Sequence, residues 1–425
     1  MSAPIIDRPV SRAGAGRPRV SRPVVPPELR RSDNPAAAVL RTAASGPVSR
    51  DNAARATGLS IATVNRQVAS LLSAGLLRER PDLTAAGAVG RPRVPFEIDH
   101  DAYLTLGIHI GAEATKIVAA DLRGRILGGL AIATPQTGQE FAVTTVARSA
   151  KAFLQRWHRR TPLWAGVAIG GRVDPQSGVV DHPKLEWKGA PIGQVLGDVL
   201  ELPVSVAPHV EAMAASELLL PTFDARRPEP DTELPAAQHG SSLYFYVRET
   251  AGIAVTLDGR VHTPSNGPGS IAHLPTGSDV QCTCGRRGCL EVTVGDRALQ
   301  ARAVGRGIIP AHNGTAGTIN DLYRAAESGS ESARELLAER ATMLGQTVAL
   351  VRDMLNPDRV VLGGQAFTGY RPALGHVARA FSQSTQLAAT DVRISGFGGK
   401  VQEFAAVVTS LSALYADPLA AVRRV

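Results

Sequence analysis

The chain is poor in cysteine, in aromatic residues and in long apolar runs. Only 3 of its 425 residues are cysteines and 4% are aromatic. No apolar run approaches the roughly 18 residues that a membrane-spanning helix needs, and the first residues lack the apolar core of a signal peptide. An odd number of closely spaced cysteines is a poor disulfide framework. We therefore expect a cytoplasmic protein that does not enter a membrane, with thiols available for a metal or for nucleophilic chemistry.

Lysine is absent from the first hundred residues, whereas arginine is frequent there. Residues 1–100 contain 15 Arg and 8 Asp or Glu (net +7), and residues 101–425 contain 31 Lys or Arg and 30 Asp or Glu (net +1). The basic excess belongs to the N-terminal part, which indicates a polyanionic partner for that part alone. The length and the apolar content of 44% predict two or three domains.

The basic region divides into an arm and a folded part. Residues 1–34 are rich in Pro, Arg, Ala and Ser without an apolar period, which predicts a disordered basic arm. Residues 35–98 contain three predicted helices, with Ser49 and Ser60 as N-caps and Gly58 and Gly75 as closing residues. Two short strands around a Gly-rich tip follow. Helix, helix, three-residue turn, helix and β-wing is the plan of a winged helix-turn-helix domain.

The third predicted helix, "SIATVNRQVASLLSAG", carries the candidate DNA contacts. Its apolar stripe consists of Val64, Val68, Leu71 and Leu72. At its N-terminal end, the side chains suited to base edges and phosphates are Ser60, Thr63, Asn65, Arg66 and Gln67. An ordinary polar surface helix is the alternative interpretation.

The string Gly-Arg-Pro-Arg occurs at residues 16–19 and again at residues 90–93. Arginine beside proline in an extended backbone suits insertion into a narrow minor groove. Arg91 and Arg93 lie in the predicted wing, which a helix-turn-helix would bring to the duplex. The copy in the arm has a solvated basic tail as its alternative.

From residue 101 onward, buried strands alternate with helices, which predicts an α/β domain. Two strand pairs end alike, in "DLRGRI" (121–126) and "LDGRV" (257–261). This similarity indicates two related lobes.

All three cysteines lie within "QCTCGRRGCLE". Cys282, Cys284 and Cys289, with His273 before them, can surround one tetrahedral ion. A closed Cys3His set is typical of structural zinc. A catalytic thiol would instead need an adjacent base and solvent access. Redox or nucleophilic thiols and inert thiols are the alternatives.

The segment "CTCGRRGCLE" resembles the metal-binding signature of the ROK family (repressors, open reading frames and sugar kinases). "LGIHIGAEATK", "GVAIGGRVDPQSGVV" and "NPDRVVLGG" follow the family order. The resemblance implies a duplicated actin-like (ribonuclease H-like) two-lobed domain over residues 101–425, whose C-terminal helices return to the first lobe. It also implies a sugar between the lobes and, in kinases, ATP beside it.

The chain departs from the kinase members of this family. Their Asp-x-Gly-Gly-Thr phosphate loop is similar to "HIGAE", which has His109 in place of Asp and Glu113 in place of Thr; a carboxylate there repels phosphate. A second phosphate loop becomes "RETAG", with only Gly252 retained. The catalytic Asp becomes His209. The resemblance therefore implies that phosphoryl transfer is lost. His109, His182 and His209 could line the cleft, or could be surface or hydrogen-bonded histidines.

The sugar site is partly retained. The resemblance maps its five contacts onto Pro208, His209, Ser270, His273 and Glu291, of which only His273 and Glu291 match the family. We take His209, Ser270, His273 and Glu291 as the candidate effector site. A sugar or sugar phosphate, a different polar effector and no effector are the alternatives.

These observations together predict a ROK-type transcriptional regulator, a repressor. It would bind a double-stranded DNA operator as a homodimer or homotetramer, because two-fold half-sites match a two-fold protein. One alternative is a ROK-type ATP-dependent sugar kinase with a DNA-binding arm. Another is a zinc-stabilised scaffold that binds protein.

Overall fold

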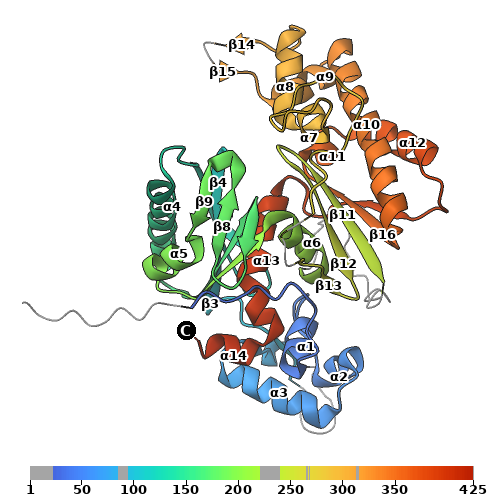
Figure 1. Ribbon diagram of the computed structural model, residues 1–425. Helices are drawn as coiled ribbons and strands as arrows, with labels where there is room; N and C mark the ends of the chain where they lie inside the picture. The colour runs from blue at the N-terminus through green and yellow to red at the C-terminus, as the bar shows by residue number, and fades with distance from the viewer. Residues whose placement is uncertain are drawn as a thin grey trace, which may run out of the picture.

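The computed structural model describes residues 23–84, 94–220, 240–264, 267, 269–312 and 315–424. The chain forms an N-terminal unit (residues 35–98), a first lobe built mainly from residues 101–220 and a second lobe built from residues 240–394. In Figure 1 the N-terminal unit, in blue, lies below the two lobes, and the red helix α13 lies between them. Among the described residues, no helix is long and apolar enough to cross a membrane.

The N-terminal unit consists of three helices and a pair of short strands. Its elements are α1 (Pro35–Thr42), α2 (Arg50–Thr57), α3 (Ile61–Ser73), β1 (Leu77–Glu79), the 3-10 helix η1 (Pro81–Leu83) and β2 (Phe96–Ile98). The side chains of Asn34, Ser49 and Ser60 accept hydrogen bonds from the first turns of the three helices. Gly58 ends α2 with a φ of 70°, a conformation that favours glycine. The predicted caps Ser49, Ser60 and Gly58 are thus confirmed, whereas α3 ends at the cap Ala74 and Gly75 follows it with a φ of 69°.

The first lobe is centred on a five-stranded sheet of order β10-β6-β3-β4-β5. Its strands are β3 (Tyr103–Ile110), β4 (Ala114–Ala120), β5 (Ile126–Ala133), β6 (Thr161–Ile169) and β10 (Val204–Pro208). The remaining elements of the lobe are α4 (Gln139–Leu154), η2 (Gln155–Trp157), β7 (Arg172–Asp174), β8 (Val179–His182), η3 (Pro183–Leu185), β9 (Trp187–Ala190), α5 (Ile192–Leu200) and α6 (His209–Leu219). Helices α4 and α5 cover one face of the sheet (Figure 1).

The second lobe has a sheet of order β13-β12-β11-β16-β17. Its strands are β11 (Ser241–Val247), β12 (Ala251–Leu257), β13 (Arg260–Val261), β16 (Arg359–Gly363) and β17 (Asp391–Ile394). It also contains α7 (Leu290–Val294), α8 (Asp296–Gly305), β14 (Ala311–His312), β15 (Thr315–Ala316), α9 (Ile319–Glu327), α10 (Glu331–Leu355), α11 (Gln365–Thr368), η4 (Arg371–Ala373) and α12 (Leu374–Ser384).

The two main sheets have the same topology. In each, three consecutive strands form an antiparallel meander, a later strand pairs in parallel with the first of them, and a still later strand pairs in parallel with that one. The repeated sequences "DLRGRI" and "LDGRV" lie at the same place in both, the turn before the third strand. The two related lobes that these repeats indicate are therefore present.

Two C-terminal helices, α13 (Val401–Ala416) and α14 (Pro418–Val422), follow the 3-10 helix η5 (Gly398–Lys400) and return to the first lobe. Helix α13 lies directly on β3 and β6 at two glycines. A Cβ at Gly166 would lie 2.1 Å from the Ser410 nitrogen, and one at Gly107 would lie 2.9 Å from the Ala406 carbonyl carbon. Only glycine permits this approach of helix to sheet.

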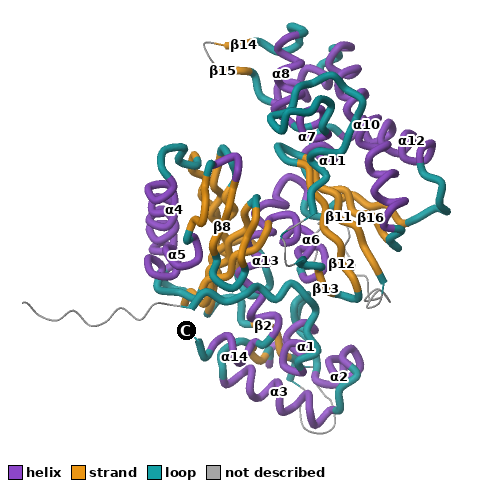
Figure 2. The backbone as a smooth tube through the Cα atoms, viewed as in Figure 1, coloured by secondary structure: helices purple, strands orange, loops and turns teal. Residues whose placement is uncertain are grey.

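Residues 23–34 form an extended segment that touches both lobes, which we call the strap. The nitrogen of Val25 donates to the Val204 oxygen at 2.8 Å in the first lobe, and the Leu29 oxygen accepts from Val261 at 3.0 Å in the second. The Ser32 hydroxyl then donates to the Ala416 oxygen at 2.7 Å. Figure 2 shows the strap as a loop that runs beneath the lobes to α1.

The prediction of a disordered arm over residues 1–34 was wrong for the strap. Its few apolar side chains have no helical or strand period, but they pack on distant parts of the chain. Leu29 is buried in the core that the N-terminal unit shares with α13, and Val24 packs on Gly193. Residues 1–22, including the first Gly-Arg-Pro-Arg string, lie outside the described residues.

Candidate nucleic-acid interface and metal centre

Helix α3 turns one face inward and presents the other to solvent. Val64, Val68 and Leu71 are fully buried against α1 and α2, while Leu72 is half-buried. Asn65 and Arg66 are exposed, and Thr63 and Gln67 are half-buried on the adjoining surface. The predicted stripe is therefore confirmed, because Leu72 also packs against the core that contains the other three residues.

The first turn of α3 is held by its cap. The Ser60 hydroxyl accepts from the Thr63 nitrogen at 3.2 Å and lies 3.0 Å from the Thr63 hydroxyl. Ile61 is 46% exposed on this turn, although a large apolar residue would ordinarily be buried. Within the described part of the chain, the Arg66 guanidinium makes no hydrogen bond or ion pair, so it is available to a partner.

The strand pair after α3 packs against it through β1. Arg50 at the start of α2 reaches this pair, donating to the Glu79 carboxylate at 2.9 Å and to the Val94 oxygen at 2.9 Å. The predicted DNA contacts Arg91 and Arg93 lie outside the described residues.

A buried carboxylate joins this strand pair to the first lobe. Glu97 on β2 is 2% exposed, and it accepts from Arg78 at 2.7 Å, from Arg80 at 3.1 Å and from Arg123 at 3.0 Å. Arg123 belongs to the β4–β5 turn of the first lobe. Burial alone would raise the pKa of the Glu97 carboxyl, but the hydrogen bond and charge of Arg78, together with the charges of Arg123 and Arg80, hold the pKa below its usual value.

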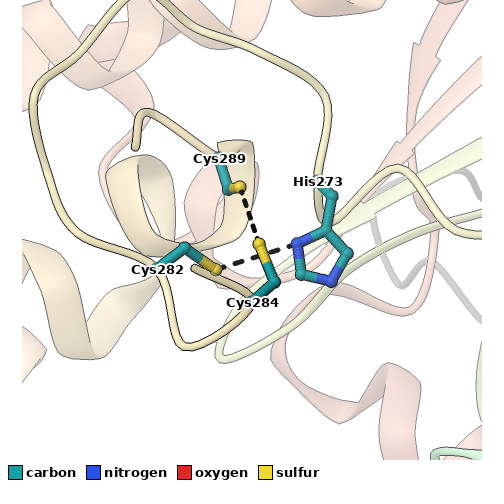
Figure 3. A group of neighbouring side chains, drawn as sticks. All are labelled: His273, Cys282, Cys284 and Cys289. Atoms are coloured by element: carbon teal, nitrogen blue, oxygen red, sulfur yellow. Dashed lines mark hydrogen bonds between the residues drawn. The ribbon is translucent and has the colours of Figure 1, made fainter. Parts of the chain in front are cut away.

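The three cysteines and His273 converge on one point in the second lobe (Figure 3). The Cys282 sulfur lies 3.7 Å from His273 Nδ1, and the Cys284 and Cys289 sulfurs lie 3.6 Å apart. All four ligand atoms lie within 4.8 Å of one another. Cys282 and Cys289 are buried, whereas Cys284 is exposed.

The loop around these residues is shaped by glycine and by backbone hydrogen bonds. Gly288 has a φ of 68°, and a Cβ on it would lie 2.4 Å from the Ser278 oxygen. The Cys282 nitrogen donates to the Arg286 oxygen at 2.9 Å, and the Leu290 nitrogen donates to the Leu274 oxygen at 2.8 Å. The loop thus fixes the sulfur positions before α7 begins.

The cluster fits a metal ion by its geometry and its chemistry. A tetrahedral zinc with metal–sulfur distances of about 2.3 Å would place sulfurs roughly 3.8 Å apart, which is near the 3.6 Å between Cys284 and Cys289. Hydrogen bonding from the Arg286 backbone and side chain lowers the pKa of Cys284 to about 6, whereas burial raises the pKa of Cys289 to about 11. The thiolate form that a metal needs is therefore favoured at Cys284 and disfavoured at Cys289. The four predicted ligands are therefore together, in a set that could hold a metal ion.

Glu291 follows the metal loop, and its carboxylate contacts the first lobe. Its Oε1 lies 2.7 Å from the Lys184 ammonium of the first lobe, and its Oε2 accepts from the Ala251 nitrogen at 3.1 Å. The Lys184 ammonium also donates to the Glu249 oxygen at 3.0 Å. Of the other candidate effector residues, His273 belongs to the metal cluster, and Ser270 is exposed, accepting from the Ala272 nitrogen at 3.3 Å.

His209 lies between the lobes in a buried group of rings. It stacks on His109 with ring centroids 5.7 Å apart and meets Tyr246 of the second lobe edge-on at 5.8 Å. Burial lowers the pKa of His209 to about 4, and burial together with the His209 charge lowers the pKa of His109 well below its usual value. Both ring nitrogens of His109 are buried and have no hydrogen-bond partner among the described residues. His182 is buried too, and its Nδ1 accepts from the Leu185 nitrogen at 3.1 Å.

Glu113 lies in the β3–β4 turn and bridges the lobes. Arg297 of α8 donates to its carboxylate at 2.8 Å. Sequence alone did not identify Lys184, Arg297 or Arg123, because each is defined by a partner far away in the chain. The exposure of Ile61 could have been expected from its place beside the cap of α3.

Residues 105–386 match the ROK family. Transcriptional regulator Rv0485 of Mycobacterium tuberculosis is 52% identical to this chain over 413 residues, which cover 96% of this chain and 91% of that protein. The DNA-binding transcriptional dual regulator NagC of Escherichia coli is 24% identical over 333 residues, which cover 75% of this chain and 77% of that protein.

Two solved structures have a similar fold. A ROK family transcriptional regulator, a homologue of the E. coli Mlc protein, aligns with a TM-score of 0.70 at 20% identity and covers 92% of this chain and 99% of its own. A ROK family glucokinase from Streptomyces griseus, in complex with glucose and AMPPNP, aligns with a TM-score of 0.60 at 22% identity. The alignment covers 72% of this chain and 99% of the glucokinase chain. The family match and the extent of the mycobacterial relative lead to one conclusion: this chain belongs to the ROK family.

Proposed function

We propose that this chain is a DNA-binding transcriptional regulator, a repressor of the ROK type. The observation that carries the proposal is the polar face of α3, with Asn65 and Arg66 exposed, on a basic N-terminal unit placed ahead of a ROK body. Its 52% identical relative, which extends over 96% of this chain, is named a transcriptional regulator. The regulator structure aligns with 92% of this chain and the glucokinase with 72%, as expected if kinases lack the N-terminal unit.

In this proposal residues 35–98 are a winged helix-turn-helix, and α3 enters the major groove. Arg66 would contact guanine, Asn65 and Gln67 adenine, and Ser60 and Thr63 phosphate. The wing would deliver Arg91 and Arg93 to the minor groove. The partner is a double-stranded operator with two half-sites, bound by a homodimer or homotetramer in the cytoplasm.

The metal cluster supports a structural zinc ion held by His273, Cys282, Cys284 and Cys289. A closed set of four protein ligands leaves no position for a reacting water. Zinc would stabilise the loop that carries Glu291, and thus one wall of the space between the lobes of the actin-like body.

The arrangement between the lobes argues against a sugar kinase. The Glu113 carboxylate, in the turn that similar kinases use for phosphate, pairs with Arg297. His209, in place of the catalytic carboxylate, is half-buried and has its pKa lowered to about 4, so its imidazole is neutral at pH 7. We propose that the body retains a sensing role, with His209, Ser270, His273 and Glu291 near a sugar, a sugar phosphate or a related polar effector.

DNA binding can be tested by fluorescence anisotropy with duplexes from the gene's own upstream region. Arg66→Ala should weaken specific binding by about 5- to 150-fold, since a bidentate base contact contributes roughly 1–3 kcal/mol. Arg324→Ala is the matched control, because Arg324 is an exposed arginine on α9 of the second lobe. Affinity should fall steeply with salt. Equal loss in both variants, or no duplex bound by the parent, would refute the proposal.

The zinc and kinase questions have direct assays. Metal analysis should return about one zinc per chain, lost in Cys289→Ser but kept in Asp279→Asn, which changes an exposed acid of the same loop. Incubation with magnesium, ATP and a panel of sugars should give no phosphorylated sugar. Measurable turnover would instead establish the kinase alternative.

A further inference from the structure

The three cysteines of the metal cluster differ in their access to solvent. Cys282 and Cys289 are 5% and 2% exposed, whereas Cys284 is exposed. It lies on the outer turn of the metal loop, where residues 283–287 are all exposed. Oxidants dissolved in water react with the thiolates that they can reach. Cys284 is therefore the cysteine at which such a reaction would begin.

A second thiol lies in position to react with an oxidised Cys284. The Cys284 and Cys289 sulfurs are 3.6 Å apart, whereas the Cys282 sulfur lies 3.7 Å from His273 Nδ1. Figure 3 shows the four side chains in these two pairs. A disulfide needs sulfurs about 2.05 Å apart, so the first pair would have to approach by roughly 1.5 Å. The turn has room for this movement, because a Cβ at Gly285 would have no atom within 4 Å.

The metal loop leads directly into a contact with the first lobe. Cys289 is the N-cap of α7, and Glu291 lies on the first turn of that helix. The Glu291 carboxylate lies 2.7 Å from the Lys184 ammonium and accepts from the Ala251 nitrogen at 3.1 Å. A bound structural metal ion stabilises the fold of the loop that holds it. Loss of the ion would therefore loosen both contacts of Glu291.

We propose that Cys284 is a site of oxidation by hydroperoxides and that its oxidation releases the zinc ion. This role of Cys284 presupposes the structural zinc ion of the proposed function. With hydrogen peroxide, the Cys284 thiolate attacks one peroxide oxygen, the O–O bond breaks, and a sulfenic acid and, after uptake of one proton, a water molecule form. The Cys289 thiolate then attacks the oxidised sulfur and displaces hydroxide, which takes up a second proton. Two thiolates thus lose two electrons, and one peroxide becomes two water molecules.

The disulfide would remove two of the four zinc ligands. Only Cys282 and His273 would remain, whereas a structural zinc ion takes four protein ligands. The chain has no fourth cysteine to replace them. Reduction by an added thiol would restore the free cysteines, so the release of zinc is reversible.

Peptide mapping of the zinc-loaded protein after treatment with hydrogen peroxide identifies the bond. Trypsin cleaves after Arg286 and Arg287, which lie between Cys284 and Cys289. The expected disulfide therefore joins two tryptic peptides, whereas a bond between Cys282 and Cys284 stays within one. Fragmentation of the joined peptides shows which cysteine of the first peptide is bonded.

A zinc-chelating dye follows the release of the metal in the same samples. One zinc ion should be released for each Cys284–Cys289 bond formed. Release of zinc without this bond, or retention of zinc and three free thiols in excess peroxide, would overturn the proposal. A parent that contains no zinc before treatment would overturn the metal centre itself, and the role of Cys284 with it.

Two histidine variants separate the reactive thiol from its role as a ligand. Cys284→His and Cys282→His each leave a Cys2His2 set, which suits zinc, but only Cys282→His retains the Cys284–Cys289 pair. In peroxide, Cys284→His should release zinc at least about tenfold more slowly than Cys282→His, because its exposed thiol is gone. Equal rates from the two zinc-loaded variants would refute the assignment. The peptide map of the parent does not depend on either variant.

Hydrogen exchange measures the consequence for the contact with the first lobe. The Ala251 amide, which donates to Glu291, should exchange faster in the oxidised protein and return to its initial rate after reduction by dithiothreitol. Unchanged exchange of this amide, in protein that has lost zinc and gained the disulfide, would refute the loosening of the Glu291 contacts.

Discussion

Replacing Glu97 by glutamine is expected to loosen the joint between the β1–β2 pair and the first lobe. The carboxylate is 2% exposed and holds three arginines. Arg78 and Arg80 each keep a second, exposed carboxylate partner in the variant. Arg123, whose side chain is 9% exposed, keeps none in the described residues. Removing one partner of a buried pair costs roughly 3–5 kcal/mol, and because a single arginine is left without a counter-charge we expect about 3 kcal/mol.

Urea unfolding at pH 7 and hydrogen exchange of the β1–β2 amides measure this loss. The pKa of Glu97 is lowered in the folded protein, so its stabilisation is present above the unfolded pKa and is lost as pH falls through the folded pKa. The difference in the free energy of unfolding between parent and variant should therefore disappear in acid. Glu79→Gln, which removes an exposed pair with Arg50, should cost no more than about 1 kcal/mol. A Glu97→Gln loss as small as this would refute the reasoning.

Three further outcomes are expected. Gly166→Ala should cost at least about 3 kcal/mol or prevent folding, since its Cβ would overlap the α13 backbone, whereas Gly269→Ala, with no atom within 4 Å, should be neutral by thermal unfolding. Leu29→Ala should cost about 3 kcal/mol and increase proteolysis of the strap. His209→Phe should lessen the loss of stability between pH 6.5 and about 4, because burial lowers the His209 pKa from 6.5 to about 4 and the unfolded chain therefore takes up the proton first. Unfolding of both proteins at a series of acid pH values should show a difference in the free energy of unfolding that approaches about 3 kcal/mol. Superimposable curves of free energy against pH would contradict this prediction.

Local features were predictable where the cause lies within a few residues. Ser60 and Gly58 indicate where helices begin and end, because the hydrogen bonds of a helix cap are made to residues within one turn. The metal ligands Cys282, Cys284 and Cys289 are close in sequence, so their spacing alone indicates a shared ion. The same holds for the exposed face of α3.

Features that depend on distant partners were not predictable. Leu29 has no periodic neighbours, and the core that buries it combines the adjacent α1 with α13, which is hundreds of residues away. The sequence around Lys184 and Arg297 does not indicate that they pair with Glu291 and Glu113. Charged residues are usually solvated, so Arg123 gave no sign that it would lie against a buried carboxylate.

The return of α13 and α14 has a consequence for how the protein is made. Both helices leave the ribosome after the two lobes, yet α13 covers the backbone of β3 and β6, and α14 packs on α1 and α3. Domains generally fold as they emerge, N-terminal first. Here the helix that would meet DNA obtains part of its support from α14, which is translated after both lobes, so a chain released before α14 would carry α3 without that contact. In the proposed function, competence to bind an operator would thus depend on the translation and docking of α13 and α14.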